Sequence, residues 1–466
     1  MENGHIRLAS ARGRWILAAT VLGSGLTMLD STVVNVALPF LGKELDADMS
    51  GLQWTINGYT LTLAGLILLG GSLGDRYGRR KVFLIGTVWF AIASAMCGLA
   101  PDVGFLVAAR ALQGVGGALL TPGSLAIIQA SFEKADRPRA VGVWSGLGGV
   151  SAAVGPLLGG WLVEWAGWRW AFLINLPFAA LVVLVALRHV PESRDEQAAG
   201  RFDVLGSVLA ALALAGITYG LIDLSAPVPL IVGVALGVAF VLVERRRSPD
   251  ALVPVGIFRD RVFTAVNVVT LIMYAAMGVV FFLLVVQLQV VSGFSPIAAG
   301  LALLPTTVLM LVLSPTAGEI AKRYGPRLPM TLGIVVAGLG FLWMSTISTG
   351  ASYALQVLPA VAVFGLGLSA AVAPLTATVL ASADERYAGT ASGVNNAVAR
   401  TGSLLAVAAV PPLVGLVGDA FKRPVVFDAG FRTAMVVSAV MMFVSAAITF
   451  LTIRTNVLAA ERAGQS

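Results

Sequence analysis

The sequence predicts an all-α integral membrane protein with fourteen membrane-spanning helices. Of its 466 residues, 58% are hydrophobic and only 12% are charged, whereas soluble globular chains are about 25% charged. Apolar runs of about 20 residues, long enough to cross a bilayer as helices, recur from end to end without a long polar block between them. Most of the 31 Lys and Arg residues fall in every second connection, which indicates the cytoplasmic side of a membrane.

The helices follow, in order, from the charged and turn-rich connections that divide the apolar runs. One missed helix would destroy the alternation of basic connections, so this alternation supports both the helix count and cytoplasmic positions for the two termini. The predicted helices cover residues 14–41, 50–73, 82–100, 103–130, 140–165, 168–187, 203–224, 226–244, 262–292, 296–321, 328–348, 353–382, 389–416 and 431–453.

An internal repeat divides these helices into two sets. The segment GSLGDRYGRRK at residues 71–81 follows the second helix, and the similar segment GEIAKRYGPRL at residues 318–328 follows the tenth. The repeat predicts two six-helix bundles, residues 1–187 and 262–466, with two extra helices inserted in the linker 188–261. Two such halves suit a transporter that rocks around a site near the middle of the membrane.

Asp30 lies in the middle of the first apolar run. As a helix, residues 15–42 would span roughly 40 Å and place Asp30 near the midplane. An Asp there costs about 2.5 to 3.5 kcal/mol on the insertion scale, so a functional role is the default interpretation. The alternative is a hydrogen bond to a neighbouring helix backbone, Ser or Thr.

Two arginines also fall inside predicted helices. Arg110, in the fourth helix, can extend its guanidinium to the outer surface, or it can keep a nearby carboxylate ionised and take part in proton exchange. Arg400, in the thirteenth, has no obvious acid at its depth in the second half. It can therefore pair with backbone carbonyls, with Asp30 or with an anionic substrate, or simply anchor helix packing. We predict Asp30, Arg110 and Arg400 as proton-coupling residues.

Residues 71–81 and the fifth helix predict conformational elements. In the loop, Gly71 allows close helix approach, Gly78 permits a turn, and Asp75 can pair with a cation or accept hydrogen bonds from a helix N-terminus. Such contacts could latch the two halves together; a run of cations that only sets orientation is the alternative. The predicted gating residues of this loop are Gly71, Asp75, Arg76, Gly78, Arg79 and Arg80.

The fifth helix contains the sequence GPLLGG at residues 155–160. Pro156 removes an intrahelical hydrogen bond, and the glycines at 155, 159 and 160 allow backbone-to-backbone packing. Close packing alone explains the glycines; a bend that lets the helix move or seal a cavity also explains the proline. We predict Gly155, Pro156, Gly159 and Gly160 as conformational residues.

Polar and aromatic side chains inside the apolar runs are candidates for the lining of a substrate cavity. For each one alone, ordinary helix packing is the alternative. They are Asn35, Trp54, Asn57, Tyr59, Gln113, Tyr274, Phe281, Gln287, Asn395 and Asn396.

Several function classes are disfavoured. The single cysteine rules out an intramolecular disulfide, and one cysteine with two histidines makes a metal site or a Cys/His hydrolase improbable. The net charge of +7 follows from membrane orientation, so no nucleic-acid partner is expected. The first run is too long for a cleaved signal peptide. A Walker-type loop is missing from the sequence, which argues against ATP as the energy source. We expect no cofactor and no enzymatic activity.

The motifs resemble those of the 14-helix drug:proton antiporter branch of the major facilitator superfamily. LDSTVVNVALP at residues 29–39 is similar to the first-helix signature of that branch, residues 71–81 to the superfamily loop motif, RALQGVGGA at 110–118 to its helix-four motif, and GPLLGG to its antiporter motif. WRWAFLINLP at 168–177 and ASGVNNAVAR at 391–400 are also similar. Ser151 stands where the antiporter motif often opens with Gly.

The resemblance implies a monomeric multi-pass protein of a bacterial inner membrane that exports hydrophobic or amphipathic drugs in exchange for protons. Asp30 and Arg110 would couple protons, Asp75 and its neighbouring cations would gate, and Gly155 with Pro156 would form the antiporter helix. Proton entry would supply the energy, and the lipid bilayer, protons and a small molecule would be the partners. Export of one lipid, siderophore or endogenous antibiotic remains an alternative. A membrane enzyme or sensor would need clustered catalytic groups or a soluble output domain, and neither is visible.

Overall fold

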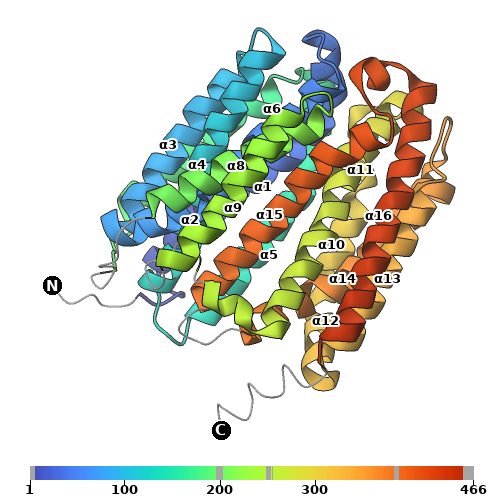
Figure 1. Ribbon diagram of the computed structural model, residues 1–466. Coiled ribbons are helices and arrows are strands. Elements are labelled where there is room, and N and C mark those ends of the chain that lie inside the picture. The colour runs from blue at the N-terminus through green and yellow to red at the C-terminus, as the bar shows by residue number, and fades with distance from the viewer. Residues whose placement is uncertain (1–5, 196–202, 248–252, 254, 383–387, 455–466) are drawn as a thin grey trace.

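A computed structural model describes residues 6–195, 203–247, 253, 255–382 and 388–454, and these residues form long helices without a named strand. Figure 1 shows two groups of helices with roughly aligned axes, one blue to green and one yellow to red, and both ends of the chain lie at the same end of the bundle. We call this the terminal end, and the other the opposite end. The prediction of an all-α architecture is confirmed.

The first half of the chain holds six membrane-length segments. Polar side chains begin three of them, because Ser10, Asp48 and Asp102 each accept a hydrogen bond from the backbone N–H three residues later. The sixth segment is broken at Ile174 instead of running continuously as predicted. The elements are α1 (Ala11–Glu44), α2 (Met49–Tyr77), α3 (Arg79–Gly98), α4 (Val103–Ser131), α5 (Arg137–Trp165), α6 (Trp170–Leu173) and α7 (Asn175–His189).

The second half repeats this plan with more interruptions. A π-helical turn extends its first helix, a second π-helical turn precedes α14, and the predicted tenth helix is divided at Leu303. The elements are η1 (Val255–Arg259), α10 (Arg261–Val286), η2 (Gln287–Val291), α11 (Pro296–Ala302), α12 (Leu304–Tyr324), α13 (Arg327–Met344), η3 (Tyr353–Val357), α14 (Leu358–Ala381), α15 (Ala388–Leu413), η5 (Gly418–Lys422) and α16 (Pro424–Thr452).

The two inserted helices, α8 (Val204–Ile222) and α9 (Pro227–Arg247), lie between the halves in sequence and across their boundary in space. They pack backbone to backbone, since a Cβ on Gly216 would lie 2.8 Å from the Cα of Gly233. Helix α8 packs against α2 of the first half and α15 of the second, and in Figure 1 these helices lie on one face of the bundle.

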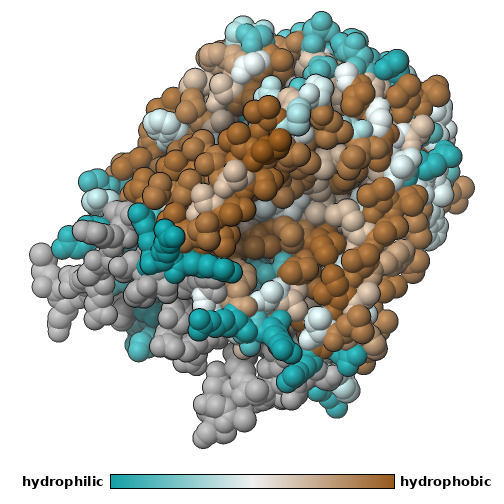
Figure 2. All heavy atoms as spheres, in the orientation of Figure 1, coloured by the Kyte–Doolittle hydropathy of each residue, from teal (hydrophilic) through white to brown (hydrophobic). Residues whose placement is uncertain are grey.

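Thirteen described helical segments are long and apolar enough to cross a membrane. Helix α15, with 26 residues, is also long enough, and it carries Asn395, Asn396 and Arg400 in its first half. With α15 included, the predicted set of fourteen is present. Figure 2 shows the expected surface, with apolar side chains covering the middle of the visible face and hydrophilic ones gathered toward its ends.

The repeat seen in the sequence is also present in the backbone. Gly78 ends α2 with φ of 114°, and Gly325 ends α12 with φ of 87°. Both angles lie in the region that favours glycine, so each half turns sharply at the same motif position. The prediction that Gly78 permits a turn is confirmed.

At the opposite end, the halves are joined by polar contacts. The Gln53 amide of α2 donates to the carbonyls of Val407 and Ala408 on α15, at 2.7 and 3.0 Å. The Gln289 amide of η2 donates to the carbonyl of Val36 on α1, at 3.0 Å. Lys422 of η5 lies 2.7 Å from Asp46, between α1 and α2. These contacts close the bundle at this end.

Helix α5 shows the difference between the two ends most clearly. Near the opposite end, a Cβ on Gly160 would lie 2.6 Å from the carbonyl oxygen of Pro296, and one on Gly300 would lie 2.1 Å from that of Pro156. Toward the terminal end, Cβ atoms on Gly142 and Gly146 would meet nothing within 4 Å. Helix α5 therefore contacts α11 tightly near the opposite end and has open space along its other end.

Candidate functional site

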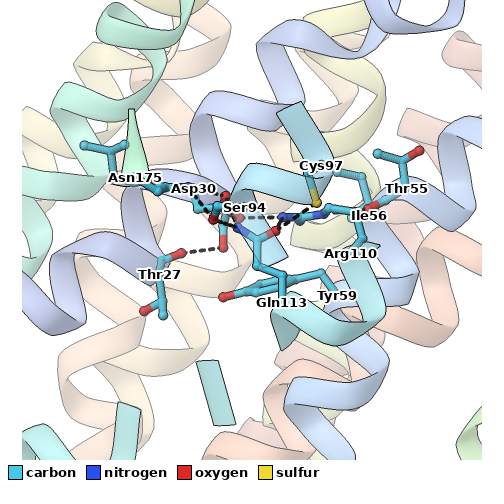
Figure 3. A network of polar contacts seen from close by, with 12 residues as sticks. Thr27, Asp30, Thr55, Ile56, Tyr59, Ser94, Cys97, Arg110, Gln113 and Asn175 are labelled. Atoms are coloured by element: carbon cyan, nitrogen blue, oxygen red, sulfur yellow. Dashed lines mark hydrogen bonds and ion pairs between the residues drawn. The ribbon is translucent and has the colours of Figure 1, made fainter. Parts of the chain in front are cut away.

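Asp30 lies at the centre of a polar network enclosed by the helices of the first half (Figure 3). Its side chain is 0% exposed. Oδ2 accepts from the Arg110 guanidinium at 2.6 Å, and Oδ1 accepts from the amides of Gln113 at 2.8 Å and Asn175 at 2.9 Å. Both carboxylate oxygens therefore have partners, as an ionised carboxylate in an apolar interior requires. The sequence left open whether Asp30 and Arg110 meet; the structure joins them.

Arg110 also has several hydrogen-bond acceptors. Its Nε donates to the Thr55 carbonyl of α2 at 3.0 Å, and the nitrogen that binds Asp30 also donates to Gln113 Oε1 at 2.6 Å. The guanidinium carbon lies 4.4 Å from the centre of the Tyr59 ring, close enough for a cation–π contact. Arg110 is 1% exposed, so the alternative in which it extends to the surface is wrong.

A second layer orients the groups that touch Asp30. Ser94 of α3 accepts from Gln113 at 2.7 Å and from Asn175 at 3.3 Å. Both amides thus point their NH₂ groups at Asp30 and Ser94, and the Gln113 carbonyl faces Arg110. Five helices, α1, α2, α3, α4 and α7, contribute to this one cluster.

Close helix packing brings these groups together. A Cβ on Gly114 of α4 would lie 2.3 Å from the Tyr59 carbonyl, and one on Gly58 of α2 would lie 3.2 Å from that of Val107. The missing side chains let α2 and α4 touch through their backbones, which brings Arg110 within reach of the Thr55 carbonyl. Asp30 sits near the middle of α1, and Arg110 lies in the third turn of α4.

The Asp30–Arg110 pair meets the conditions for a stable buried ion pair. In a low-dielectric interior, an ion pair is stable only with good geometry and complete hydrogen bonding, both of which Asp30 and Arg110 have. Removing one charge from such a pair costs about 3–5 kcal/mol, because the other charge is left uncompensated.

Arg400 does not join this network. The Asp30 oxygens are engaged by groups of the first half, and Arg400 Nε is buried without an acceptor. Helix α15, which carries Arg400, packs against α10 of the second half and α2 of the first, so it lies at the boundary between the halves. The predicted proton-coupling group of three is therefore divided by the structure into a bonded pair and a separate cation.

The predicted cavity residues have different surroundings. Gln113 is part of the Asp30 network, and Gln287 bonds to the Ile347 carbonyl and to Asp428 at the opposite end, so neither amide faces open space. Asn396 is exposed. Three aromatic candidates pack on other side chains: Trp54 on Tyr219, Tyr59 on Arg110, and Phe281 on Phe364. Asn395 donates to Asn267 and Thr270, and Tyr274 is partly buried. Asn35 Oδ1 and both polar side-chain atoms of Asn57 are buried without hydrogen-bond partners.

The loop at residues 71–81 is bound within the first half. Asp75 pairs with Arg79 at 2.7 Å, and Glu192, after α7, accepts from the backbone N–H groups of Arg80 and Lys81. A Cβ on Gly71 would make ordinary contact with Pro122 of α4, at 3.5 Å. Asp75 thus pairs with an arginine, one of its two predicted roles, and Glu192 accepts at the N-terminus of α3. The latch between the halves stays a prediction.

The glycines of α5 pack against both halves. Cβ atoms on Gly155 and Gly159 would lie 1.8 Å from Thr32 Oγ1 and 2.9 Å from the Val33 Cα of α1. Gly160 meets α11 of the second half, as described above. The helix therefore touches α1 two or three residues beyond Asp30, and Pro156 and Gly160, next to these glycines, touch α11.

Sequence reasoning missed Asn175, Ser94 and Asp428. Asn175 is an amide inside the apolar sixth run, and that polarity is the signal that could have identified it. Ser94 carries no such signal, because serine is common in membrane helices. Asp428 lies in the first turns of α16, where its oxygens accept from Gln287 and Ser348. Among the described residues, no group of three or more His, Cys, Asp or Glu is placed to hold a metal ion.

Comparisons with known proteins agree with this geometry. The model of the Major Facilitator Superfamily matches residues 20–407. The chain is 34% identical over 428 residues to a tetracenomycin C resistance and export protein of Streptomyces glaucescens, covering 90% of this chain and 79% of that protein. It is 35% identical over 402 residues to the multidrug resistance protein Stp of Mycobacterium tuberculosis, covering 84% and 74%.

Among solved structures, the fold resembles a POT family transporter crystallised with 5-aminolevulinic acid. The TM-score is 0.74 over 97% of this chain and 99% of that one, at 14% sequence identity. At this identity, the likeness concerns the arrangement of the helices.

Proposed function

Because the chain belongs to the Major Facilitator Superfamily, whose members are membrane transporters and not enzymes, we propose that it is a proton-coupled exporter of apolar or amphipathic drugs and toxic compounds. The observation that carries proton coupling is the buried Asp30–Arg110 pair at 2.6 Å. An ionisable pair this deep in an apolar bundle is costly, and transporters use such groups to bind protons.

The orientation of the basic connections supports a cytoplasmic terminal end in a bacterial inner membrane. The closed opposite end then faces outward, and the open space along α5 faces the cytoplasm. This corresponds to the inward-open state of an alternating-access cycle, in which the exporter collects its cargo from the cell. The bilayer, a small molecule and protons are the partners, and the chain acts as a monomer without a cofactor.

Proton binding separates Asp30 from Arg110. A proton on Oδ2 removes the negative charge that holds the guanidinium, whereas Arg110 keeps the Thr55 carbonyl, Gln113 Oε1 and the Tyr59 ring. Neutral Asp30 still accepts from Gln113 and Asn175 through Oδ1. The ionic tie between α1 and α4 is thereby lost, the neutral hydrogen bond from Gln113 remains, and Arg110 keeps its other acceptors.

Movement of α1 reaches the boundary between the halves. This helix carries Asp30 in its middle, packs on the α5 glycines just beyond it, and accepts from Gln289 of the second half at Val36. A proton arriving from outside can thus change the contacts that close the outer end. Each charge that crosses 100 mV releases about 2.3 kcal/mol, which sets the scale of the gradient that one proton can support.

The names of the relatives support two substrate specificities, one broad and one narrow. Stp is named for multidrug resistance, which favours broad specificity, and the Streptomyces glaucescens protein is named for one compound, which favours a dedicated exporter of an endogenous antibiotic. A panel of toxic compounds in cells that lack other pumps separates these forms, since a dedicated exporter protects against one chemical series only.

Inverted membrane vesicles test the proposal directly. Wild-type vesicles are energised with a pH gradient, and accumulation of a panel of fluorescent dyes is measured with and without a protonophore. We expect proton-dependent accumulation by wild type and none by Asp30→Asn, although the variant is present in the membrane at a similar level.

Asp223→Asn is the matched control, because Asp223 is an exposed carboxylate at the end of α8. It should transport as wild type does. Proton-driven accumulation that is unchanged in Asp30→Asn would contradict the proposal.

A further inference from the structure

Arg400 lies halfway along α15 and has no acidic partner in the described part of the chain. Its Nε is buried without a hydrogen-bond acceptor, and no ion pair of its guanidinium is found among those residues.

Arg110 provides an internal comparison. Both arginines lie inside membrane-spanning helices. Arg110 has a carboxylate, a carbonyl, an amide oxygen and an aromatic face as partners, whereas Arg400 Nε is buried without an acceptor. Keeping an unpaired cation in a largely apolar interior is costly. The missing acceptor is therefore expected to be something that enters and leaves.

The surroundings of Arg400 indicate what that acceptor is. Asn396 lies one turn earlier on the same face of α15, and its side chain is exposed, so its amide is available as a second donor. A cation and an amide donor on one face of a largely apolar helix suit an organic anion with an apolar body.

We propose that Arg400 binds the anionic group of exported molecules, a carboxylate or phenolate carried on an apolar or aromatic body, with Asn396 as a second donor. This proposal rests on the proposed export function and names the class of substrate. Asp30 is not the permanent partner of Arg400, because its oxygens already accept from Arg110, Gln113 and Asn175.

In this proposal the charge of the substrate and the charge of the proton are bound by different residues, Arg400 and Asp30, in different halves of the chain. Exchange of an outgoing anion for an incoming proton moves two charges in the same electrical direction, whereas exchange of a monovalent cation for one proton moves none.

Two dyes with the same xanthene skeleton test the inference on the purified full-length protein in detergent. Fluorescein is anionic and rhodamine 6G is cationic at neutral pH. Binding is measured by fluorescence polarisation for wild type, Arg400→Gln, Arg400→Lys and Asn396→Ala. We expect Arg400→Gln to weaken fluorescein binding by about tenfold or more and rhodamine 6G binding by less than twofold, with Arg400→Lys and Asn396→Ala between these limits.

Arg423→Gln, at an exposed arginine after η5, is the matched control and should bind both dyes as wild type does. Thermal unfolding shows whether Arg400→Gln is folded. If it is not, the dye comparison is made with Arg400→Lys, which keeps the positive charge. Failure of wild type to bind fluorescein, or equal losses for both dyes in Arg400→Gln, would overturn the inference. The binding assay needs no proton gradient, so its result is independent of whether the vesicle assay supports proton-driven export.

Discussion

The two halves share a plan but treat buried charge differently. In the first half, Asp30 and Arg110 are completely bonded to each other and to neighbouring amides. Extending the alignment of Arg76 with Arg323 back along the chain places Met277, a buried apolar residue, opposite Asp30. In the described part of the second half, Arg400 has no acidic partner. The difference teaches that a repeated scaffold can hold a fully bonded ion pair in one half and an unpaired cation in the other.

The largest expected effect comes from breaking the satisfied pair. Arg110→Gln leaves Asp30 buried without its cation, so we expect loss of proton-driven transport and a loss of stability of about 3–5 kcal/mol. The double variant Asp30→Asn/Arg110→Gln should be more stable than Arg110→Gln alone, because no charge remains unpaired. Thermal unfolding of the purified proteins measures both effects, and additive losses would show that the two side chains are not coupled.

The next effect concerns packing between the halves. Gly300→Ala would place a methyl group only 2.1 Å from the carbonyl oxygen of Pro156, so α5 and α11 must move apart near the opposite end. We expect transport to fall by roughly tenfold and the outer side to become accessible to a membrane-impermeant thiol reagent at an introduced cysteine. Gly146→Ala is the control, because Gly146 also lies on α5 but a Cβ there would meet nothing within 4 Å, and it should have no such effect. Equal behaviour of the two variants would contradict this assignment of the seal.

A smaller effect is expected for Asn175, which holds one Asp30 oxygen at 2.9 Å. Asn175→Leu leaves Oδ1 with the Gln113 amide only, so we expect a loss of about 1–3 kcal/mol and a changed pH dependence of vesicle transport. Thr218→Val is the control, because Thr218 is buried in α8 and its hydroxyl has no partner. A pH profile identical to that of wild type in Asn175→Leu would mean that this amide does not tune the proton site.

The smallest effect is expected for the exposed ion pair between Lys422 and Asp46 at the opposite end. Lys422 lowers the pKa of Asp46 below its usual 3.8, and Asp46 and Asp419 raise the pKa of Lys422. The contact is therefore lost only as pH falls through the lowered carboxyl pKa or rises through the raised ammonium pKa, and it is constant near neutrality. Lys422→Gln should change outer-end accessibility slightly and equally at pH 6 and pH 8. A clear difference between these two pH values would contradict this.

Much of the fold could be predicted from the sequence because bilayer thickness and basic connections determine helix number and direction. The breaks at Ile174 and Leu303 each precede a proline, Pro177 and Pro305, which removes a hydrogen bond from the preceding turn. They could not be predicted because other helices, such as α4 with Pro122, continue through a proline unbroken. Asp30 and Arg110 were identifiable as buried charges, but their meeting depends on glycine contacts between α2 and α4 that only the three-dimensional packing reveals. Asn175 and Ser94 join them for the same reason.

Substrate-induced proton release by the purified protein tests the central claim most directly. A dye that supports transport is added to weakly buffered protein, and the released protons are followed with a pH indicator. We predict release by wild type and by Asp223→Asn, and no release by Asp30→Asn, whose dye binding is checked in the same sample. Unchanged proton release by Asp30→Asn would contradict the assignment of Asp30 as the proton-coupling group.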